Sequence, residues 1–226
     1  MARDNAPRER HRRQLERKKA HRASYDRILI VSEGSKTEPH YFSEIRATYR
    51  LHTANVVLQP SQLGTEPIQV VQYARELFIR GDGHRHIQQR AFERVYAVFD
   101  RDEHESCINA LNTAASLDGK LRNDNKQPVI FKAIASVPSF ELWLLLHYAD
   151  ILAPIHRDEV MRRLKGHIPG YEKGAKDIFA TTRDRVDVAT RRARALATRH
   201  SAYTDPEPYT AIAELVTLLT TLRNKQ

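Results

Sequence analysis

The chain has 226 residues, with 41% hydrophobic and 29% charged residues, which suits one domain or one domain with a smaller appendage. The 37 Lys and Arg residues outnumber the 28 Asp and Glu residues, and the resulting net charge of +9 is compatible with a nucleic-acid partner but does not specify one. Cys107 is the only cysteine, so we expect no disulfide framework. No apolar stretch approaches the ~20 residues of a membrane helix, so we expect no membrane partner and no secretory signal. Together these features predict a cytoplasmic protein.

Residues 1–24 are predicted to form a basic arm, disordered or helical, ahead of the folded part. Nine Lys and Arg residues stand among the first 22 positions against three acidic residues, and Leu15 is almost the only apolar side chain. Such a segment cannot bury a hydrophobic face of its own. It is either an arm that neutralises phosphates or a solvated tail that keeps the protein soluble.

Strand and helix patterns alternate four times between residues 25 and 150. We predict strands over 27–32, 54–58, 94–99 and 128–133, and helices over 39–49, 66–78, 104–117 and 138–148. This alternation predicts an α/β core with a mostly parallel sheet flanked by helices. Helical patterns over 186–200 and 208–223, after short mixed pieces, predict a helical C-terminal part over 151–226 that packs on the core.

Carboxylates follow two of the predicted strands. Glu33 comes after the first strand, and Asp100 and Asp102 come after the third. Because parallel strands end at the same sheet edge, these side chains should meet there, and three crowded carboxylates favour a hard cation such as Mg²⁺ or Mn²⁺. Alternatively, they are ordinary acidic residues that cap helices and face solvent, since a lone Asp-x-Asp is common.

Three segments together resemble the RloB-like family. They are LIVSEGSKTE over 29–38, VFDRDEH over 98–104 and PSFELWLLLH over 138–147, and the resemblance runs from about residue 25 to the C-terminus. Glu33 followed by the Asp100-x-Asp102 pair also resembles the catalytic pattern of the Toprim fold. The resemblance implies a Toprim-like core and a metal-dependent nuclease of bacterial phage defence (abortive infection). It also implies a separate ABC-like ATPase partner, with RNA, including tRNA, or DNA as substrate.

Carried over residue by residue, the resemblance makes Glu33 a metal-linked general acid or base and Asp100 and Asp102 the ligands of Mg²⁺ or Mn²⁺. Glu38 either orients the site or stabilises a helix N-terminus. His104 either shuttles protons or starts a surface helix.

Glu141 is the last candidate for the catalytic set. It lies in a strongly apolar helix, so it either joins the site or forms an ion pair with Lys132 or Lys173. No tyrosine adjoins the acidic motifs in the manner of a topoisomerase nucleophile, although Tyr41 is near, so metal-activated water is the expected nucleophile.

Basic side chains near these motifs are candidates for contacts with the nucleic-acid backbone. They are Lys36, Lys173, Lys176, Arg191 and Arg192, and the alternative for each is a solvated surface residue. No Walker-type phosphate loop is found, so ATP binding by this chain is not indicated. The other functional hypothesis is a non-catalytic nucleic-acid-binding or regulatory subunit of a defence complex, and a homo-oligomer is compatible with either function.

Overall fold

The computed structural model describes residues 25–101, 106–203 and 208–225. Its centre is a five-stranded sheet with the strand order β2-β1-β3-β4-β5. The strands are β1 (Ile28–Ser32), β2 (Val56–Pro60), β3 (Arg94–Asp100), β4 (Ile130–Val137) and β5 (Tyr209–Thr210). The first four strands are parallel and β5 pairs antiparallel with β4. The predicted α/β class and mostly parallel sheet are therefore confirmed.

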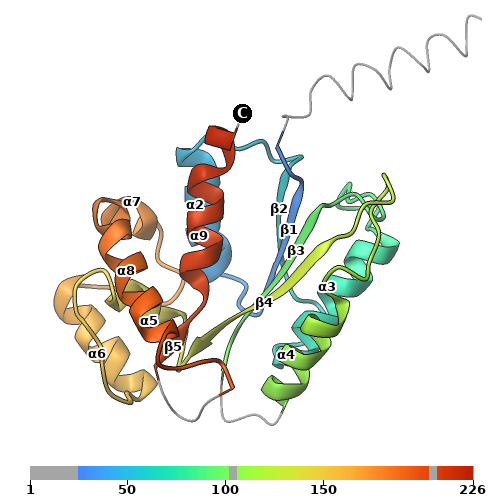
Figure 1. Ribbon diagram of the computed structural model, residues 1–226. Coiled ribbons are helices and arrows are strands. Elements are labelled where there is room, and N and C mark those ends of the chain that lie inside the picture. Colours follow the sequence, from blue (N-terminus) through green and yellow to red (C-terminus); the bar gives the residue numbers. More distant parts are fainter. Residues whose placement is uncertain (1–24, 102–105, 204–207, 226) are drawn as a thin grey trace, which may run out of the picture.

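Helices cover both faces of this sheet (Figure 1). On one face lie α3 (Pro67–Arg80) and α4 (Ser106–Leu117). On the other lie α2 (Thr37–Thr48) and α9 (Ile212–Thr221), beside a group formed by α5 (Phe140–Leu145), α6 (Arg157–His167), α7 (Ile178–Thr182) and α8 (Val186–Ala197). Short 3₁₀ helices over Arg183–Arg185 and Leu222–Lys225 precede α8 and follow α9. No helix in this described part of the chain is long and apolar enough to cross a membrane.

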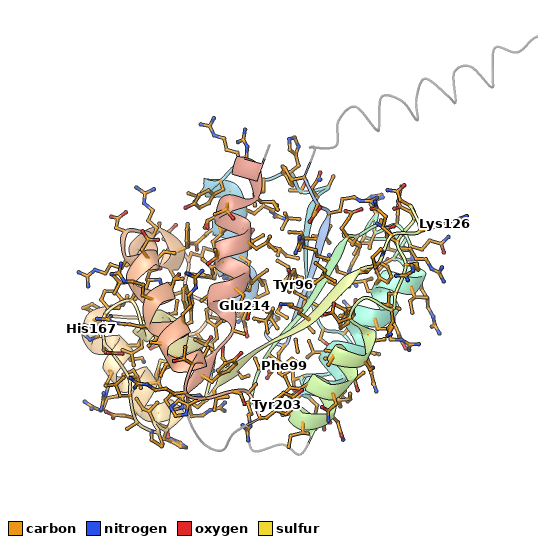
Figure 2. The ribbon with its side chains drawn as sticks, in the orientation of Figure 1. Tyr96, Phe99, Lys126, His167, Tyr203 and Glu214 are labelled. Atoms are coloured by element: carbon orange, nitrogen blue, oxygen red, sulfur yellow. The ribbon has the colours of Figure 1, made fainter. Side chains whose placement is uncertain are left out.

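The sheet divides the hydrophobic core into two clusters. Tyr96 of β3 belongs to the cluster beneath α2 and α9, whereas Phe99 belongs to the cluster beneath α3 and α4 (Figure 2). The interior strand β1 is buried at every position because both of its faces are covered, which explains its apolar sequence. Along β3, Asp100 continues the row of Tyr96 and Val98 and therefore faces the α2 side.

The last predicted helix, over 208–223, is wrong at its start. Tyr209 and Thr210 instead form β5, and α9 begins only at Ile212. The reason is the exposed edge of β4, whose backbone groups need partners: the amide of Ala211 donates to the carbonyl of Ala135 at 3.0 Å. The predicted helix over 138–148 is also too long, because α5 covers only Phe140–Leu145. The C-terminal part thus completes the sheet as well as covering it.

An ion network closes the opposite end of the sheet, where β1 begins. The guanidinium of Arg27 pairs with Glu93 at 2.5 Å and with Asp124 at 2.6 Å, and Asn123 donates to Glu93 at 3.1 Å. The two carboxylates keep the guanidinium charged and raise its pKa, although burial opposes this. The buried positive charge of Arg27 is thus neutralised by the carboxylates of Glu93 and Asp124.

Candidate functional site

The candidate site lies at the carboxyl edge of β1 and β3. These strands are parallel neighbours, with Ser32 opposite Val98, so the residues that follow each of them emerge together. The amide of Asp100 donates to Oε2 of Glu33 at 2.9 Å, and the amide of Glu33 donates to the carbonyl of Val98 at 2.8 Å. The expectation that Glu33 and Asp100 meet at one edge is confirmed for these two residues.

Asp100 links this edge to the start of α5. Its Oδ1 accepts the amide of Phe140 at 2.8 Å, which fixes the carboxyl group next to the helix that carries Glu141. Removal of this carboxyl group from water raises the pKa of Asp100 well above its usual value, and the negative charges of Glu38, Glu33 and Glu141 raise it further. Asp100 is therefore the centre of a cluster of four carboxyl groups, which we call the acidic cluster: Glu33, Glu38, Asp100 and Glu141.

Glu38 is buried in the first turn of α2 and lies directly over Gly34. A Cβ atom at position 34 would lie 2.3 Å from Oε2 of Glu38, so a larger residue there would displace this carboxyl group. Burial raises the pKa of Glu38 to about 7, and the charges of Glu33 and Glu141 act in the same direction. Of the two roles expected for Glu38, membership of the site is the one that this placement favours.

Glu141 is buried but well provided with partners. Its Oε2 accepts the hydroxyl of Ser139 at 2.8 Å, and its Oε1 accepts the hydroxyl of Tyr171 at 3.4 Å. Nζ of Lys173 lies 3.8 Å from the same Oε1. Of the two lysines expected to pair with Glu141, the structure selects Lys173, because Lys132 pairs with Glu214 of α9.

Tyr171 and Lys173 reach the acidic cluster on the segment between α6 and α7, which docks on the start of α2. The amide of Gly174 donates to Oγ1 of Thr37 at 2.9 Å, and the carbonyl of Gly174 lies 3.0 Å from Nδ1 of His40. The side chain of Lys36 packs over Gly174, leaving no room for a Cβ there. We call residues 171–174 the docking loop.

Tyr171 is the member of the site that sequence reasoning missed. It is 1% exposed, and burial together with the charges of Glu141, Glu38 and Asp100 raises the pKa of its hydroxyl. The only signal in the sequence was its position two residues before Lys173 in a polar segment, and nothing in that spacing points to Glu141.

The basic candidates are distributed unevenly around the acidic cluster. Lys173 is in the cluster, Lys36 lies beside it against the docking loop, and Lys176 is exposed a few residues further along. Arg191 is exposed on α8. Arg192 donates from Nη1 to the carbonyl of Leu146 at 2.7 Å, which favours a structural role at the end of α5.

Two catalytic candidates, Asp102 and His104, lie outside the described residues, as does the basic arm over 1–24. Within the described ranges, no three His, Cys, Asp or Glu side chains form a group that could hold a metal ion. The donor chemistry nevertheless suits a hard cation, because the cluster offers carboxylate oxygens whose negative charges raise the pKa of Asp100 even though Lys173 opposes them. Mg²⁺ commonly takes one or two protein carboxylates together with water and substrate phosphates, and Glu33 with Asp100 matches that number of carboxylates.

Comparison with protein families gave a match to a family described as RloB-like protein, over residues 28–219 of this chain. Comparisons with curated proteins and with solved structures gave no match. The matched range includes the whole acidic cluster and the docking loop, and it leaves out the basic arm.

Proposed function

The chain belongs to the RloB-like family, and from this membership and the acidic cluster we propose that it is a metal-dependent nuclease with a Toprim-type site. It would hydrolyse phosphodiester bonds of RNA, including tRNA, or of DNA in bacterial phage defence. The observation that carries the proposal is the hydrogen bond between Asp100 and Glu33, which brings two carboxylates together at the carboxyl edge of neighbouring parallel strands. Ligands of α/β sheets bind at this edge.

Four residues of the site have a task in this proposal. Glu33 and Asp100 would hold Mg²⁺ or Mn²⁺, and a bound ion of this kind activates water and neutralises charge on phosphate oxygens. Lys173, whose side chain is 60% exposed beside Glu141, would contact a phosphate of the substrate. Glu38, with its pKa near 7, can hold or release a proton at its carboxyl group near neutral pH. Tyr41 and Tyr171 are each 1% exposed, so neither hydroxyl is placed to attack a substrate, and metal-activated water remains the proposed nucleophile.

The proposal includes an ATPase as a separate chain. No Walker-type phosphate loop occurs in the sequence, so any dependence on ATP would have to come from a partner with an ABC-like ATPase domain. The exposed cations Lys36, Lys176 and Arg191 remain candidates for contacts with the nucleic-acid backbone.

The test is cleavage of total bacterial RNA and of plasmid DNA by the purified chain with Mg²⁺ or Mn²⁺, alone and with the ATPase encoded beside it. Glu33→Gln and Asp100→Asn are the diagnostic variants, and Glu214→Gln, an exposed carboxylate on α9, is the matched control. Fragments that disappear in both variants and with chelator, but persist in the control, support a nuclease and identify its substrate. Equal behaviour of the wild type and both variants would reject it.

A second candidate is a non-catalytic nucleic-acid-binding subunit. It is favoured by the use of Asp100 Oδ1 and Glu33 Oε2 as acceptors of backbone amides, together with the lack of a three-ligand group among the described side chains. This candidate predicts nucleic-acid binding of unchanged affinity in chelator and in the Asp100→Asn variant, with no cleavage under any condition.

A further inference from the structure

Two loops meet at the end of the sheet opposite the acidic cluster. The loop over 81–93 precedes β3 and the loop over 118–129 precedes β4, and because these strands are parallel neighbours both loops lie at the same edge. The amide of Asp124 donates to the carbonyl of Arg90 at 2.8 Å, which joins the two loops. We call them the basic loops. The seven residues of β3 separate them from the acidic cluster by about 20 Å.

Basic side chains in these loops occupy a backbone conformation that suits other residue types better. The φ angles of His86, Arg90 and Lys126 are 56°, 53° and 62°, in the left-handed region. Glycine and asparagine adopt this region at lower cost than residues with long side chains. All three side chains are exposed, so packing in the core does not explain them, and Lys126 projects from a corner of the molecule (Figure 2). Unfavourable backbone conformations of this kind are concentrated at functional sites.

The acidic residues of the basic loops are already engaged by groups of the protein itself. Two of them neutralise Arg27, one pairs with Arg85, and one accepts the backbone amide of Phe131; they are Asp82, Glu93, Asp118 and Asp124. Four exposed cations of the same loops pair with no carboxylate in the described ranges of the chain: Arg90, Lys120, Arg122 and Lys126. Their positive charges are therefore available to an anion from outside the protein.

A phosphate backbone fits this surface better than a folded protein does. Among the described residues, none of the large hydrophobic side chains that are exposed lies in the basic loops, whereas the centre of a protein–protein interface is rich in such side chains and poor in charge. A nucleic-acid backbone needs cations alone. Residues 1–24 lead into β1, which begins at this same edge, and they add nine Lys and Arg residues in sequence.

We propose that the basic loops are a second nucleic-acid-binding surface, remote from the acidic cluster, which holds the phosphate backbone of RNA or DNA. Binding there needs neither metal nor cleavage, so it is independent of the nuclease activity proposed above. In a nuclease, this surface would hold a part of the substrate that lies away from the cleaved bond.

Fluorescence anisotropy of labelled RNA and DNA oligonucleotides with the full chain, in chelator to prevent cleavage, tests this surface. The diagnostic variant combines Arg90→Asn with Lys126→Asn, because asparagine suits the left-handed backbone and lacks the charge. We expect the affinity to fall at least about 10-fold, and the slope of log K against log salt to become less steep by about two, one for each lost phosphate contact. The melting temperature should not fall, which separates lost binding from lost folding.

The matched control combines Arg194→Gln with Arg199→Gln, which removes two exposed cations from α8 and the residues that follow it. It should bind as the wild type does, and equal weakening in the control would overturn the proposal, since the loss would then follow net charge alone. Unchanged affinity and salt dependence in the asparagine variant would also overturn it. So would a wild-type chain that binds neither RNA nor DNA in chelator, which would leave the surface to an acidic protein. Binding through the basic loops without any cleavage would reject only the nuclease.

Discussion

Oε2 of Glu33 accepts the amide of Asp100 at 2.9 Å, although 67 residues separate the two in sequence. The bond connects the residue after β1 with the last residue of β3, and it extends the pairing of these strands from main chain to side chain. It also holds the Glu33 carboxyl group close to Asp100, and the negative charge of Glu33 raises the pKa of Asp100. Structure and electrostatics of the acidic cluster therefore depend on the same contact.

Asp100→Asn should abolish activity while stabilising the fold. Asparagine keeps an Oδ1 that can accept the amide of Phe140 but removes a charge that burial and three neighbouring carboxylates disfavour. We expect cleavage to fall by at least about 100-fold. We expect the melting temperature at pH 8 to rise by about 2–4 °C, the shift that ~1 kcal/mol causes in a chain of this size. Thermal unfolding followed by circular dichroism measures the second effect, and a lower melting temperature at pH 8 would contradict it.

Glu38 should make the protein less stable as the pH rises. The pKa of Glu38 is about 7 in the folded protein against 4.5 in the unfolded chain, so folding takes up a proton between these values. The free energy of unfolding therefore falls as the pH rises from about 4.5 through 7, by about 3 kcal/mol in total, and the penalty is absent below pH 4.5, where both states are protonated. Urea titrations at about pH 5, 6, 7 and 8, which span this window, give the free energy of unfolding at each pH. Its dependence on pH should be weaker for Glu38→Gln, whereas Glu214→Gln should follow the wild type.

A divalent cation should stabilise the protein more at high pH than at low pH. At pH 8 the carboxyl groups of Glu38 and Asp100 are more fully ionised, and a bound cation relieves their mutual repulsion. Adding MgCl₂ should therefore raise the melting temperature at pH 8 and have little effect at pH 5. Asp100→Asn should reduce the shift, and NaCl at equal ionic strength is the control. An equal shift in the variant would place the cation elsewhere.

Tyr171→Phe should reduce activity without loosening the core. The variant keeps the buried ring and removes only the hydroxyl that donates to Glu141. We expect about a 10-fold loss of cleavage, the equivalent of ~1.4 kcal/mol, which lies at the low end for a hydrogen bond to a charged group. Ser139→Ala removes the shorter bond to the other oxygen of Glu141 and should cost at least as much. Activity equal to the wild type in both variants would show that the orientation of Glu141 is unimportant.

Lys173→Ala should weaken nucleic-acid binding more than Lys165→Ala. Lys173 stands at the acidic cluster, whereas Lys165 pairs with Glu172 at 2.7 Å, so both variants remove one exposed lysine from the same region. The loss for Lys173→Ala should grow smaller as salt increases, because the contact is with phosphate. Fluorescence anisotropy with labelled oligonucleotides in several salt concentrations measures this. Indistinguishable affinities of the two variants would remove Lys173 from the binding surface.

The sheet was predictable from sequence because its strands are short apolar runs bounded by polar residues, as in the segment over 27–32. The meeting of Glu33 and Asp100 was predictable as well, since both residues follow parallel strands, and it occurs because β1 and β3 are neighbours in the sheet. The strand β5 was not predictable, because a segment of two residues is too short to show the alternating pattern of a strand. Tyr209 and Thr210 become a strand only through the edge of β4, which is a property of the tertiary structure.

The docking loop marks the second limit of sequence reasoning. Nothing in residues 171–174 shows that they reach α2, because the contacts are backbone groups of Gly174 with Thr37 and His40. The sequence also does not show that the Glu38 carboxyl group lies against Gly34. Such contacts depend on three-dimensional proximity, so they leave no periodic pattern.

The two ends of the sheet differ in their electrostatic balance. Around Arg27, positive and negative charges neutralise one another, whereas at the carboxyl edge several carboxyl groups lie close enough together to raise the pKa of Asp100, with Lys173 opposing them. The two groups of charges lie at opposite ends of the sheet and share no residue, so stability can be adjusted at one end without changing the carboxyl groups at the other. Substitutions that raise thermal stability at Arg27, Glu93 or Asp124 should therefore leave the acidic cluster intact.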